Sequence, residues 1–303
     1  MPMANRTNAL KVGIVGGRGY LGQALHGYCD DHNIENWIIG RQSGTEIEAS
    51  HDGYRSSVPD LRAAVRGATT IFHLATVSTP ALGAQDPALD LENVSFTVKL
   101  IDACRKEGVR HLIFPSSGGT IYGDCRCPVD EDSPANPLCS YAIAKFASER
   151  YLRLAQQRDD LDITILRISN VFGGTQVKKG DQGVVGYLKD AILADQDVIL
   201  FGDTVRDYLY IDDLLYAFDL SMHQPRGFQL YNIGTGVGTT LVALARLIYG
   251  LLGRKERFTL GERRPFDLPF NVLRIEKARQ SLGWVPKISV QDGMTQLLEL
   301  AAR

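Results

Sequence analysis

A tyrosine and a lysine four residues apart are the first residues of this chain whose types and spacing could do chemistry. Tyr141 and Lys145 lie in SYAIAKFASER, residues 140–150, which has the apolar periodicity of a helix. Residues four apart lie one above the other on a single helix face. An ammonium group favours the phenolate form of a neighbouring tyrosine, so proton exchange becomes accessible near neutral pH. The pair is therefore a candidate for acid–base catalysis.

Hydroxyl side chains precede this helix in SSGGTIYG, residues 116–123. Ser116, Ser117 and Thr120 follow an apolar run that predicts a buried strand. Tyr-x-x-x-Lys alone is common on helix surfaces. The pair gains weight here because these hydroxyl groups could orient a substrate oxygen beside the tyrosine.

A glycine-rich turn near the start of the chain could hold a diphosphate. In KVGIVGGRGYLGQAL, residues 11–25, an apolar run ends in glycines and resumes as a helical pattern. Two overlapping patterns share Gly19 and Gly22, one beginning at Gly16 and the other at Gly17. Such glycines allow a tight turn and a close approach of backbone N–H groups to a diphosphate at the N-terminus of the helix. A turn of this kind can be purely structural, but its place at the first strand–helix junction favours a dinucleotide site.

The end of the second predicted strand, WIIGRQSG, indicates which dinucleotide is bound. An NAD site usually has an acidic residue about 20 positions after the glycine turn, and an NADP site has a cation instead. Gly40 stands where the acid is expected, Arg41 follows it, and Ser43 adds a hydroxyl. Arg18, within the glycine turn, would be a second cation at the same end of the adenosine. Both arginines could be solvated loop residues, but together with the missing acid they predict NADP(H), with NAD(H) as the alternative.

Composition narrows the class of protein. The 303 residues include 44% hydrophobic and 22% charged residues, and the formal net charge is −2. Because there is no basic excess or dense basic run, a nucleic-acid partner is not expected. No signal peptide is recognised, and no stretch approaches the roughly 18 apolar residues of a membrane helix. We expect a cytoplasmic protein without a membrane partner.

The five cysteines suit a reducing compartment, because their number is odd and their density is low. Cys125, Cys127 and Cys139 could hold a metal ion, but no second close pair of cysteines or histidines completes a zinc pattern. No metal site is expected.

Strand-like and helix-like segments alternate along the first part of the chain, which predicts a doubly wound parallel α/β sheet, a Rossmann fold. After Gly173 the alternation loosens, so we expect a smaller α/β lobe interleaved with the first. The expected strands are 11–17, 36–41, 69–75, 110–117 and 162–170, with helices at 20–31, 60–67, 94–108 and 140–158. Later segments of regular pattern are 183–195, 196–203, 206–222, 228–236, 239–253 and a last helical pattern at 272–284.

Together these motifs resemble the extended short-chain dehydrogenase/reductases that act on nucleotide sugars, the epimerases, dehydratases and 4-ketoreductases. The resemblance covers nearly the whole chain, and its motifs occur in the family's order. They are GGRGYLG, FHLAT (72–76), LENVSFT (91–97), SSGGTIYG, SYAIAK, LRISNVFG (166–173), RDYLYIDDL (206–214), YNIGTG (231–236), RRPFD (263–267) and LGWVP (282–286).

The resemblance implies roles for particular residues. Tyr141 is the expected catalytic acid and base, and Lys145 is expected to tune it and to hold the nicotinamide ribose. The cofactor site is expected to comprise Gly16, Arg18, Gly19, Tyr20, Leu21, Gly22, Arg41, Ser43, Leu74, Ala75 and Lys145. The expected substrate residues are Asn93, which supports the active site, Asn170, Arg206 and Arg264 along the diphosphate, and Val184 and Val185 near the base.

The resemblance also implies the assembly and the division of the chain. Residues 1–172, with part of 203–236, would form the dinucleotide-binding domain. Residues 173–202 and 237–303 would form the nucleotide-sugar lobe. A homodimer through a helix bundle is expected from the resemblance alone.

Two departures from the family pattern matter. Many relatives have the catalytic hydroxyl four residues before the tyrosine of the Tyr-Gly pair, where this chain has Gly118. The role must then pass to Ser117 or Thr120, and the sequence leaves the choice open. The segment GGTQVKKGDQG lacks the usual proline, which leaves open whether Lys178 or Lys179 touches phosphate.

Three functions fit these observations. The first is reduction of a nucleotide-activated ketosugar by NADPH, at C4 of a 4-keto-6-deoxy sugar. The second is a nucleotide-sugar 4-epimerase with tightly bound NAD(P), and the third is a dinucleotide sensor with an inactive site. The intact Tyr141 and Lys145 argue against the third. Because a net reductase must exchange its cofactor at every turnover and uses the NADPH pool, the arginines favour reduction over epimerisation.

Overall fold

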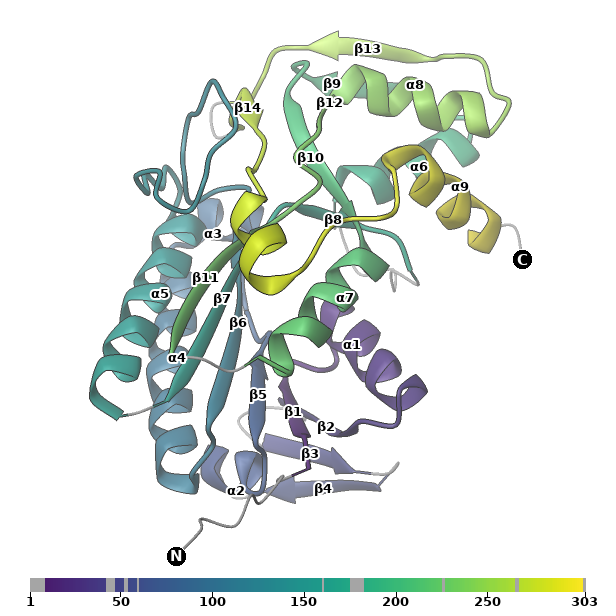
Figure 1. Ribbon diagram of the computed structural model, residues 1–303. Helices are drawn as coiled ribbons and strands as arrows, with labels where there is room; N and C mark the ends of the chain where they lie inside the picture. The colour runs from purple at the N-terminus through teal and green to yellow at the C-terminus, as the bar shows by residue number, and fades with distance from the viewer. Residues whose placement is uncertain are drawn as a thin grey trace, which may run out of the picture.

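The computed structural model describes residues 9–41, 47–51, 54–58, 60–159, 161–174, 183–224, 227–264 and 267–301. Figure 1 shows a large sheet flanked by helices and, above it, a smaller group of strands and helices that includes the C-terminus. No helix among these residues is long and apolar enough to cross a membrane.

The main sheet confirms the predicted doubly wound fold. Six strands are parallel, with β1 at the centre between β2 and β5, and a hairpin of β3 and β4 extends one edge in antiparallel pairing. Across the sheet the order is β11 (Phe228–Ile233), β7 (Asp162–Ile168), β6 (His111–Ser117), β5 (Thr70–His73), β1 (Lys11–Val15), β2 (Glu35–Arg41), β3 (Ile47–His51) and β4 (Tyr54–Val58).

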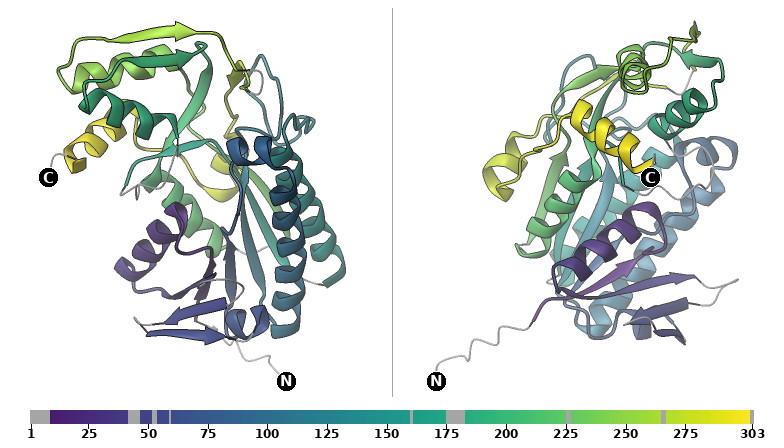
Figure 2. Two further views of the ribbon diagram at one scale, coloured as in Figure 1. Left: turned by 180° about the vertical axis from the view of Figure 1, so that it is seen from behind. Right: turned by 90° about the vertical axis from the view of Figure 1, so that its right-hand side faces the viewer.

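The parallel strands are apolar on both faces because helices cover both. Val12 and Ile14 of β1 belong to one buried cluster, and Val15 belongs to another on the opposite face. Figures 1 and 2 show the two layers of helices on opposite sides of the sheet. One layer contains α1 (Tyr20–Asp31) and α7 (Ile211–Met222), and the other contains α2 (Leu61–Val65), α4 (Ala88–Glu107) and α5 (Ser140–Asp159), with α3 (Pro80–Gln85) beside α5.

Two small sheets and three helices form the second part of the structure. Strand β10 is central, because it pairs with β8, β12 and β14. The division into two domains with the limits given above stays a prediction. The elements are β8 (Asn170–Phe172), β10 (Val205–Tyr210), β12 (Gly238–Thr240), β14 (Phe270–Asn271), the parallel pair β9 (Val198–Phe201) and β13 (Phe258–Gly261), and helices α6 (Val184–Leu193), α8 (Leu241–Leu251) and α9 (Val290–Ala301).

Some elements differ from the expected ones. The sequence patterns did not reveal the β3–β4 hairpin, α3 or α9. The helical pattern at 272–284 was partly wrong, because Val272 to Ile275 are extended or irregular and only residues 276–282, including the π-helical turn η1 (Ala278–Leu282), are helical. Asn271 and Leu273 are fully buried. Asn271 pairs with β10 and Leu273 forms a bridge to Val129, so their burial reflects strand pairing and not the inner face of a helix.

Two buried carboxylates of the motif RDYLYIDDL join segments that are distant in sequence. Asp207 accepts hydrogen bonds from Thr235 N and Thr235 Oγ1, both at 2.7 Å, and from Gly236 N at 3.1 Å. Asp213 accepts from Lys287 N and Ile288 N, both at 2.9 Å. Because a buried carboxylate needs several donors, these aspartates fix the loops after β11 and before α9 onto β10 and α7.

The outer edge of β11 is covered by the chain between Tyr122 and Glu131. Glu131 Oε1 accepts from Asn232 N at 2.7 Å, an amide on the side of β11 that faces away from β7. The Asn232 side chain accepts from the Tyr122 hydroxyl at 2.7 Å and donates to Val129 O at 3.0 Å. The edge strand therefore has polar partners although no further strand pairs with it among the described residues.

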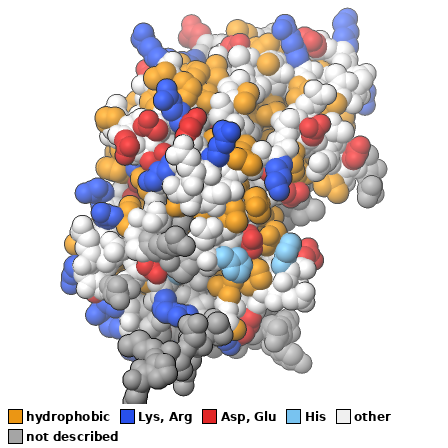
Figure 3. All heavy atoms as spheres, viewed as in Figure 1, with side chains coloured by type: hydrophobic (Ala, Val, Ile, Leu, Met, Phe, Trp, Pro, Cys, Tyr) orange, Lys and Arg blue, Asp and Glu red, His pale blue; other side chains and the backbone are white. Residues whose placement is uncertain are grey.

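Basic and acidic side chains are intermixed on the face of the molecule in Figure 3, which shows no broad field of one sign. This distribution agrees with the near-neutral composition and offers no basic stripe for nucleic acid on that face.

Candidate active site and cofactor cavity

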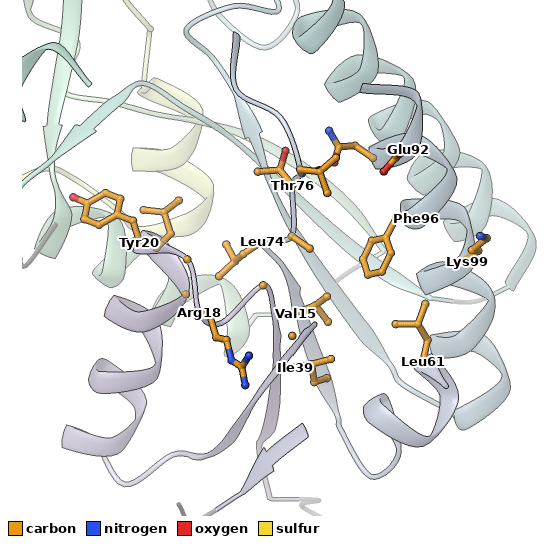
Figure 4. A pocket seen from close by; sticks show the side chains of 18 of the residues that line it. Val15, Arg18, Tyr20, Ile39, Leu61, Leu74, Thr76, Glu92, Phe96 and Lys99 are labelled. Atoms are coloured by element: carbon orange, nitrogen blue, oxygen red, sulfur yellow. The ribbon is translucent and has the colours of Figure 1, made fainter. Parts of the chain in front are cut away.

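A cavity of about 830 Å³ opens at the carboxyl ends of β1, β2 and β5 (Figure 4). This is the position at which doubly wound sheets bind their ligands. The cavity has the size of a small-molecule site. Its lining includes the expected cofactor residues Gly16, Arg18, Gly19, Tyr20, Leu21, Gly22, Leu74 and Ala75.

The glycine turn is packed so closely that Gly16 and Gly22 have no room for a side chain. Gly16 has φ +86°, and a Cβ atom there would lie 2.5 Å from Ala75 N. A Cβ atom at Gly22 would lie 2.5 Å from Gly16 O. Helix α1 follows with Gly19 as its N-cap and no side-chain cap, so the amides at its start are not capped by a side chain. The turn therefore fits the diphosphate of a dinucleotide.

Arg18 lies over Gly40. A Cβ atom at Gly40 would be 3.6 Å from Arg18 Cδ and 3.8 Å from Arg18 Nε, which are ordinary contact distances. Figure 4 shows the Arg18 guanidinium at the end of the cavity near Ile39. The structure thus places a cation beside the position where an acid would bind a ribose. The side chain of Arg41 and all of Ser43 lie outside the described residues, as do Lys178 and Lys179.

Tyr141 and Lys145 lie on α5 and border a small space shared with Asn93, His73 and Thr97. Lys145 Nζ donates to Pro115 O at 2.9 Å, at the end of β6. The same nitrogen lies 4.6 Å from the ring centroid of Phe114 and 5.9 Å from that of Tyr141. The helix and the strand therefore bring the expected acid–base pair to the inner end of the cofactor cavity, where Asn93 belongs to both spaces.

The pKa values of Lys145 and Tyr141 differ from those of the same groups in water. Burial lowers the pKa of Lys145 to about 8, against the opposing effect of Glu149. Burial also raises the pKa of Tyr141, and the nearby Cys139 and Asp90 add to the rise. Desolvation of the phenolate is the largest effect on the Tyr141 pKa, and it opposes the lowering that is expected from Lys145. Tyr141 is thus held as a neutral phenol that can donate a proton.

The candidate hydroxyls contact each other. Thr120 Oγ1 donates to Ser117 Oγ at 2.9 Å, and both side chains are partly exposed. Ser116 is buried and donates to Glu149 Oε1 at 2.6 Å, so its hydroxyl is not available to a substrate. Ser117 and Thr120 remain the two candidates. We call this hydrogen-bonded pair the hydroxyl unit.

Gly118 has no room for the side chain that many relatives carry at this position. A Cβ atom there would lie 2.6 Å from Leu273 Cδ1 and 3.0 Å from Arg167 O. Leu273 is fully buried, and Asn271 Nδ2 donates to Gly118 O at 3.0 Å. The hydroxyl is absent here because β14 and the residues after it pack directly on the backbone.

We expect Gly118→Ser to destabilise the protein by about 1–3 kcal/mol without increasing turnover, because the new side chain overpacks a filled core. Denaturant unfolding followed by circular dichroism measures the loss. Gly119→Ser is the matched control, since a Cβ atom at Gly119 has its nearest neighbour at 3.9 Å and should cost little. A Gly118→Ser protein as stable as the wild type and more active would contradict this explanation.

The expected substrate residues are distributed over two groups. Asn93 Oδ1 accepts from Val77 N at 2.9 Å, and its Nδ2 donates to Ser78 Oγ at 2.8 Å, so the side chain braces the cavity wall. Asn170 Nδ2 donates to Asp207 O at 3.2 Å. Asn170 also lies beside Gly119, whose Cβ would be 4.0 Å from it, and thus near the hydroxyl unit.

Two of the remaining expected substrate residues, Arg206 and Arg264, are cations. Arg206 is partly buried, and burial lowers its pKa, with Arg263 and Arg264 adding to the effect. Arg264 is exposed, pairs with Asp267 at 2.7 Å and lies 5.5 Å from the ring centroid of Phe201. Arg264 thus takes part in a surface ion pair, and its charge still acts on Arg206.

The structure adds two residues that the sequence motifs did not single out. Arg263 belongs to the same basic group as Arg206 and Arg264, and the doubled arginine of RRPFD was the available signal. Glu149 acts on the charge of Lys145, the expected catalytic lysine, and its position four residues after Lys145 was visible in the sequence. Val184 and Val185 begin α6, where Val185 is buried and Val184 is partly buried against the same core.

All five cysteines are free, and the described residues contain no group of three His, Cys, Asp or Glu side chains placed to hold a metal ion.

Comparison with known proteins identifies the family. A family model described as the NAD dependent epimerase/dehydratase family matches residues 12–234. The chain is 36% identical over 233 residues to a UDP-glucose 4-epimerase of Mycolicibacterium smegmatis, covering 76% of this chain and 74% of the relative. It is 35% identical over 236 residues to a dTDP-4-dehydro-6-deoxyglucose reductase of Escherichia coli, with 76% and 74% covered.

Among solved structures, a UDP-glucose 4-epimerase of Thermotoga maritima with UDP-glucose superposes with a TM-score of 0.86 at 27% identity. That alignment covers 97% of this chain and 99% of the other. The match of the family model, the two sequence relatives and the shared fold agree with the motifs from the glycine turn to LGWVP. The chain therefore belongs to the NAD-dependent epimerase/dehydratase family of extended short-chain dehydrogenase/reductases.

Proposed function

We propose that this protein reduces a nucleotide-activated ketosugar with NADPH, at C4 of a 4-keto-6-deoxy sugar. Its family consists of NAD(P)-dependent enzymes that act on nucleotide sugars, and this chain is one of them. The observation that carries the proposal is Arg18 lying against Gly40, because a guanidinium at this position suits the 2′-phosphate of NADPH and the acid that would bind NAD is missing. The Escherichia coli reductase among the relatives supports this reaction.

The residues of the site have distinct roles in this proposal. NADPH, when bound, supplies the hydride to the carbonyl carbon. Tyr141, a neutral phenol in this environment, donates its proton to the carbonyl oxygen. Ser117 and Thr120 hold that oxygen by hydrogen bonds. Lys145 is fixed by Pro115 O and holds the nicotinamide ribose.

The nucleotide sugar would lie between the two parts of the structure. Asn93 borders the small space beside Tyr141, Asn170 lies near the hydroxyl unit, and Arg206 and Arg264 supply the cations that a diphosphate needs. Val184 and Val185 would contact the base from α6. In this arrangement the nucleotide would lie against the second part of the structure, and the sugar would lie beside Tyr141.

A nucleotide-sugar 4-epimerase is the second candidate function. The Mycolicibacterium smegmatis relative and the Thermotoga maritima structure both carry that activity in their names, which favours it. The same residues could oxidise C4 and reduce it from the opposite face. The two reactions differ in whether NADPH is consumed.

We expect the purified protein to be largely free of dinucleotide and to consume one equivalent of NADPH for each 4-keto-6-deoxy nucleotide sugar reduced. Loss of absorbance at the NADPH maximum and chromatography of the nucleotide sugars measure this. In a parallel reaction, a UDP-hexose is incubated with NAD and with NADP. No NADPH loss in the first mixture, with equilibration of C4 epimers in the second, would replace the reductase by the epimerase.

A homodimer in the cytoplasm is also part of the proposal. Helices α4 and α5 pack side by side, and each exposes large apolar side chains. Such a patch on two neighbouring helices is typical of an interface between subunits. The exposed residues are Leu91 and Val98 on α4 and Ile143, Tyr151 and Leu154 on α5.

A further inference from the structure

A buried glutamate continues the line of catalytic side chains along α5. Glu149 follows Lys145 by four residues and Tyr141 by eight, so the three lie on one face of the helix. The residue is buried, with 4% of its surface exposed. It accepts hydrogen bonds from Arg167 Nη2 at 2.7 Å, Arg167 Nε at 3.1 Å and Ser116 Oγ at 2.6 Å.

The Ser116 contact connects this carboxylate to the catalytic groups. Ser116 stands between Pro115, whose carbonyl oxygen accepts from Lys145, and Ser117, whose hydroxyl accepts from Thr120. Three consecutive residues at the end of β6 are therefore connected to both Lys145 and the Ser117–Thr120 pair. A shift of Ser116 would move the acceptor of the lysine and the hydroxyl unit together.

We propose that Glu149, held by Arg167, is a positioning residue that sets the end of β6 against the Tyr141–Lys145 face of α5. The proposal rests on the proposed function only in assigning the chemistry to Tyr141 and Lys145, and it applies equally to reduction and to epimerisation. Glu149 does not touch the reacting atoms and acts through Ser116 and Lys145.

The chemistry of the contact explains why a charged group serves this purpose. A carboxylate forms shorter and more directional hydrogen bonds than a neutral acceptor. An apolar pair of similar volume could hold the helix on the strand equally well. The ion pair therefore contributes more to the orientation of the strand against the helix than to stability. The negative charge of Glu149 also raises the pKa of Lys145 against its burial and thus favours the ammonium form.

Two variants remove this positioning in different ways. Ser116→Ala deletes one hydrogen bond and leaves the ion pair intact. The double variant Glu149→Leu with Arg167→Met replaces the ion pair by apolar side chains, which avoids an uncompensated buried charge and keeps the protein folded. Thr164→Val is the matched control, because it deletes a similarly buried bond to His111 at the opposite end of β6, 2.9 Å long.

We expect kcat to fall about tenfold in Ser116→Ala and about 10–100-fold in the double variant, with the Kd for NADPH changed less than about threefold. Thr164→Val should lose similar thermal stability and keep the wild-type kcat. Turnover is measured with whichever of the two reactions, reduction or epimerisation, the wild type catalyses. Wild-type kcat in Ser116→Ala and in the double variant would overturn the proposal.

A second readout does not depend on activity. In lysine-labelled protein without cofactor, the signal of Lys145 is identified by its disappearance in Lys145→Arg and is titrated by NMR. Its pKa should be lower in the double variant than in the wild type and unchanged in Thr164→Val. An unchanged pKa in the double variant would also overturn the proposal. An inactive wild type would contradict the proposed function, while this titration would still decide the role of Glu149.

Discussion

Replacing Tyr141 by phenylalanine should reduce turnover by about 10²–10⁴-fold, because the change removes the proton donor and keeps the ring in place. The Tyr141 pKa is raised by burial, so in the proposed reaction the wild-type enzyme carries the proton that the carbonyl oxygen receives. No other tyrosine borders the small space between Lys145 and Asn93 among the described residues, so none can take over this transfer. Steady-state kinetics with the active nucleotide sugar measures the loss.

The affinity for NADPH should change little in this variant, since the phenol oxygen is not part of the glycine turn or of the adenosine end of the cavity. Fluorescence titration measures this affinity. Tyr151→Phe is the matched control, because Tyr151 lies on the same helix with its side chain exposed. It should keep wild-type turnover. Full activity in Tyr141→Phe would refute the acid–base assignment.

Introducing an acid at Gly40 should reverse the cofactor preference. In Gly40→Asp the new carboxylate has room, because its Cβ atom would be 3.6 Å from Arg18 Cδ. It would pair with the Arg18 guanidinium, repel a 2′-phosphate and accept hydrogen bonds from a ribose 2′-hydroxyl. Losing one charge-assisted contact costs about 1.5–3 kcal/mol, a factor of roughly 10–100 in NADPH affinity. With the gain for NADH, the ratio of the two Kd values should shift by about 10²–10³-fold.

Isothermal titration with NADPH and with NADH measures both constants in the same protein. Gly27→Asp controls for the added negative charge, because Gly27 is exposed on α1 and a Cβ atom there would have no neighbour within 4 Å. It should leave both affinities unchanged. Equal weakening of NADPH and NADH in Gly40→Asp would show that the 2′-phosphate does not bind beside Arg18.

The fold was predictable wherever burial on both faces of a strand leaves a continuous apolar run. The runs that became β1, β5, β6 and β7 have this character, and the helices between them carry an apolar stripe. The β3–β4 hairpin extends only the edge of the sheet, so no long apolar run marks it. The segment at 272–275 misled the helical interpretation, because it directly follows the β14 residues that pair with β10, and its Leu273 forms a bridge to Val129.

The candidate site was predictable where local spacing produces the geometry. Tyr141 and Lys145 are one helical turn apart, and the glycine turn lies at a single strand–helix junction. Contacts between distant segments were not predictable. Nothing near Gly118 in the sequence indicates that Leu273 fills the space of its side chain, and nothing near Ser116 indicates that its hydroxyl is directed to Glu149.

The cover on β11 affects how this protein behaves beside other copies of itself. An uncovered edge strand offers free amides and carbonyls on which another chain can add a strand, which leads to aggregation. At Asn232 the outward amide is already bonded to the Glu131 carboxylate, so an incoming strand would have to displace a charged acceptor. The loop from Tyr122 to Glu131 thus hinders the addition of another strand at Asn232, which is a form of self-association separate from the proposed contact through the helices.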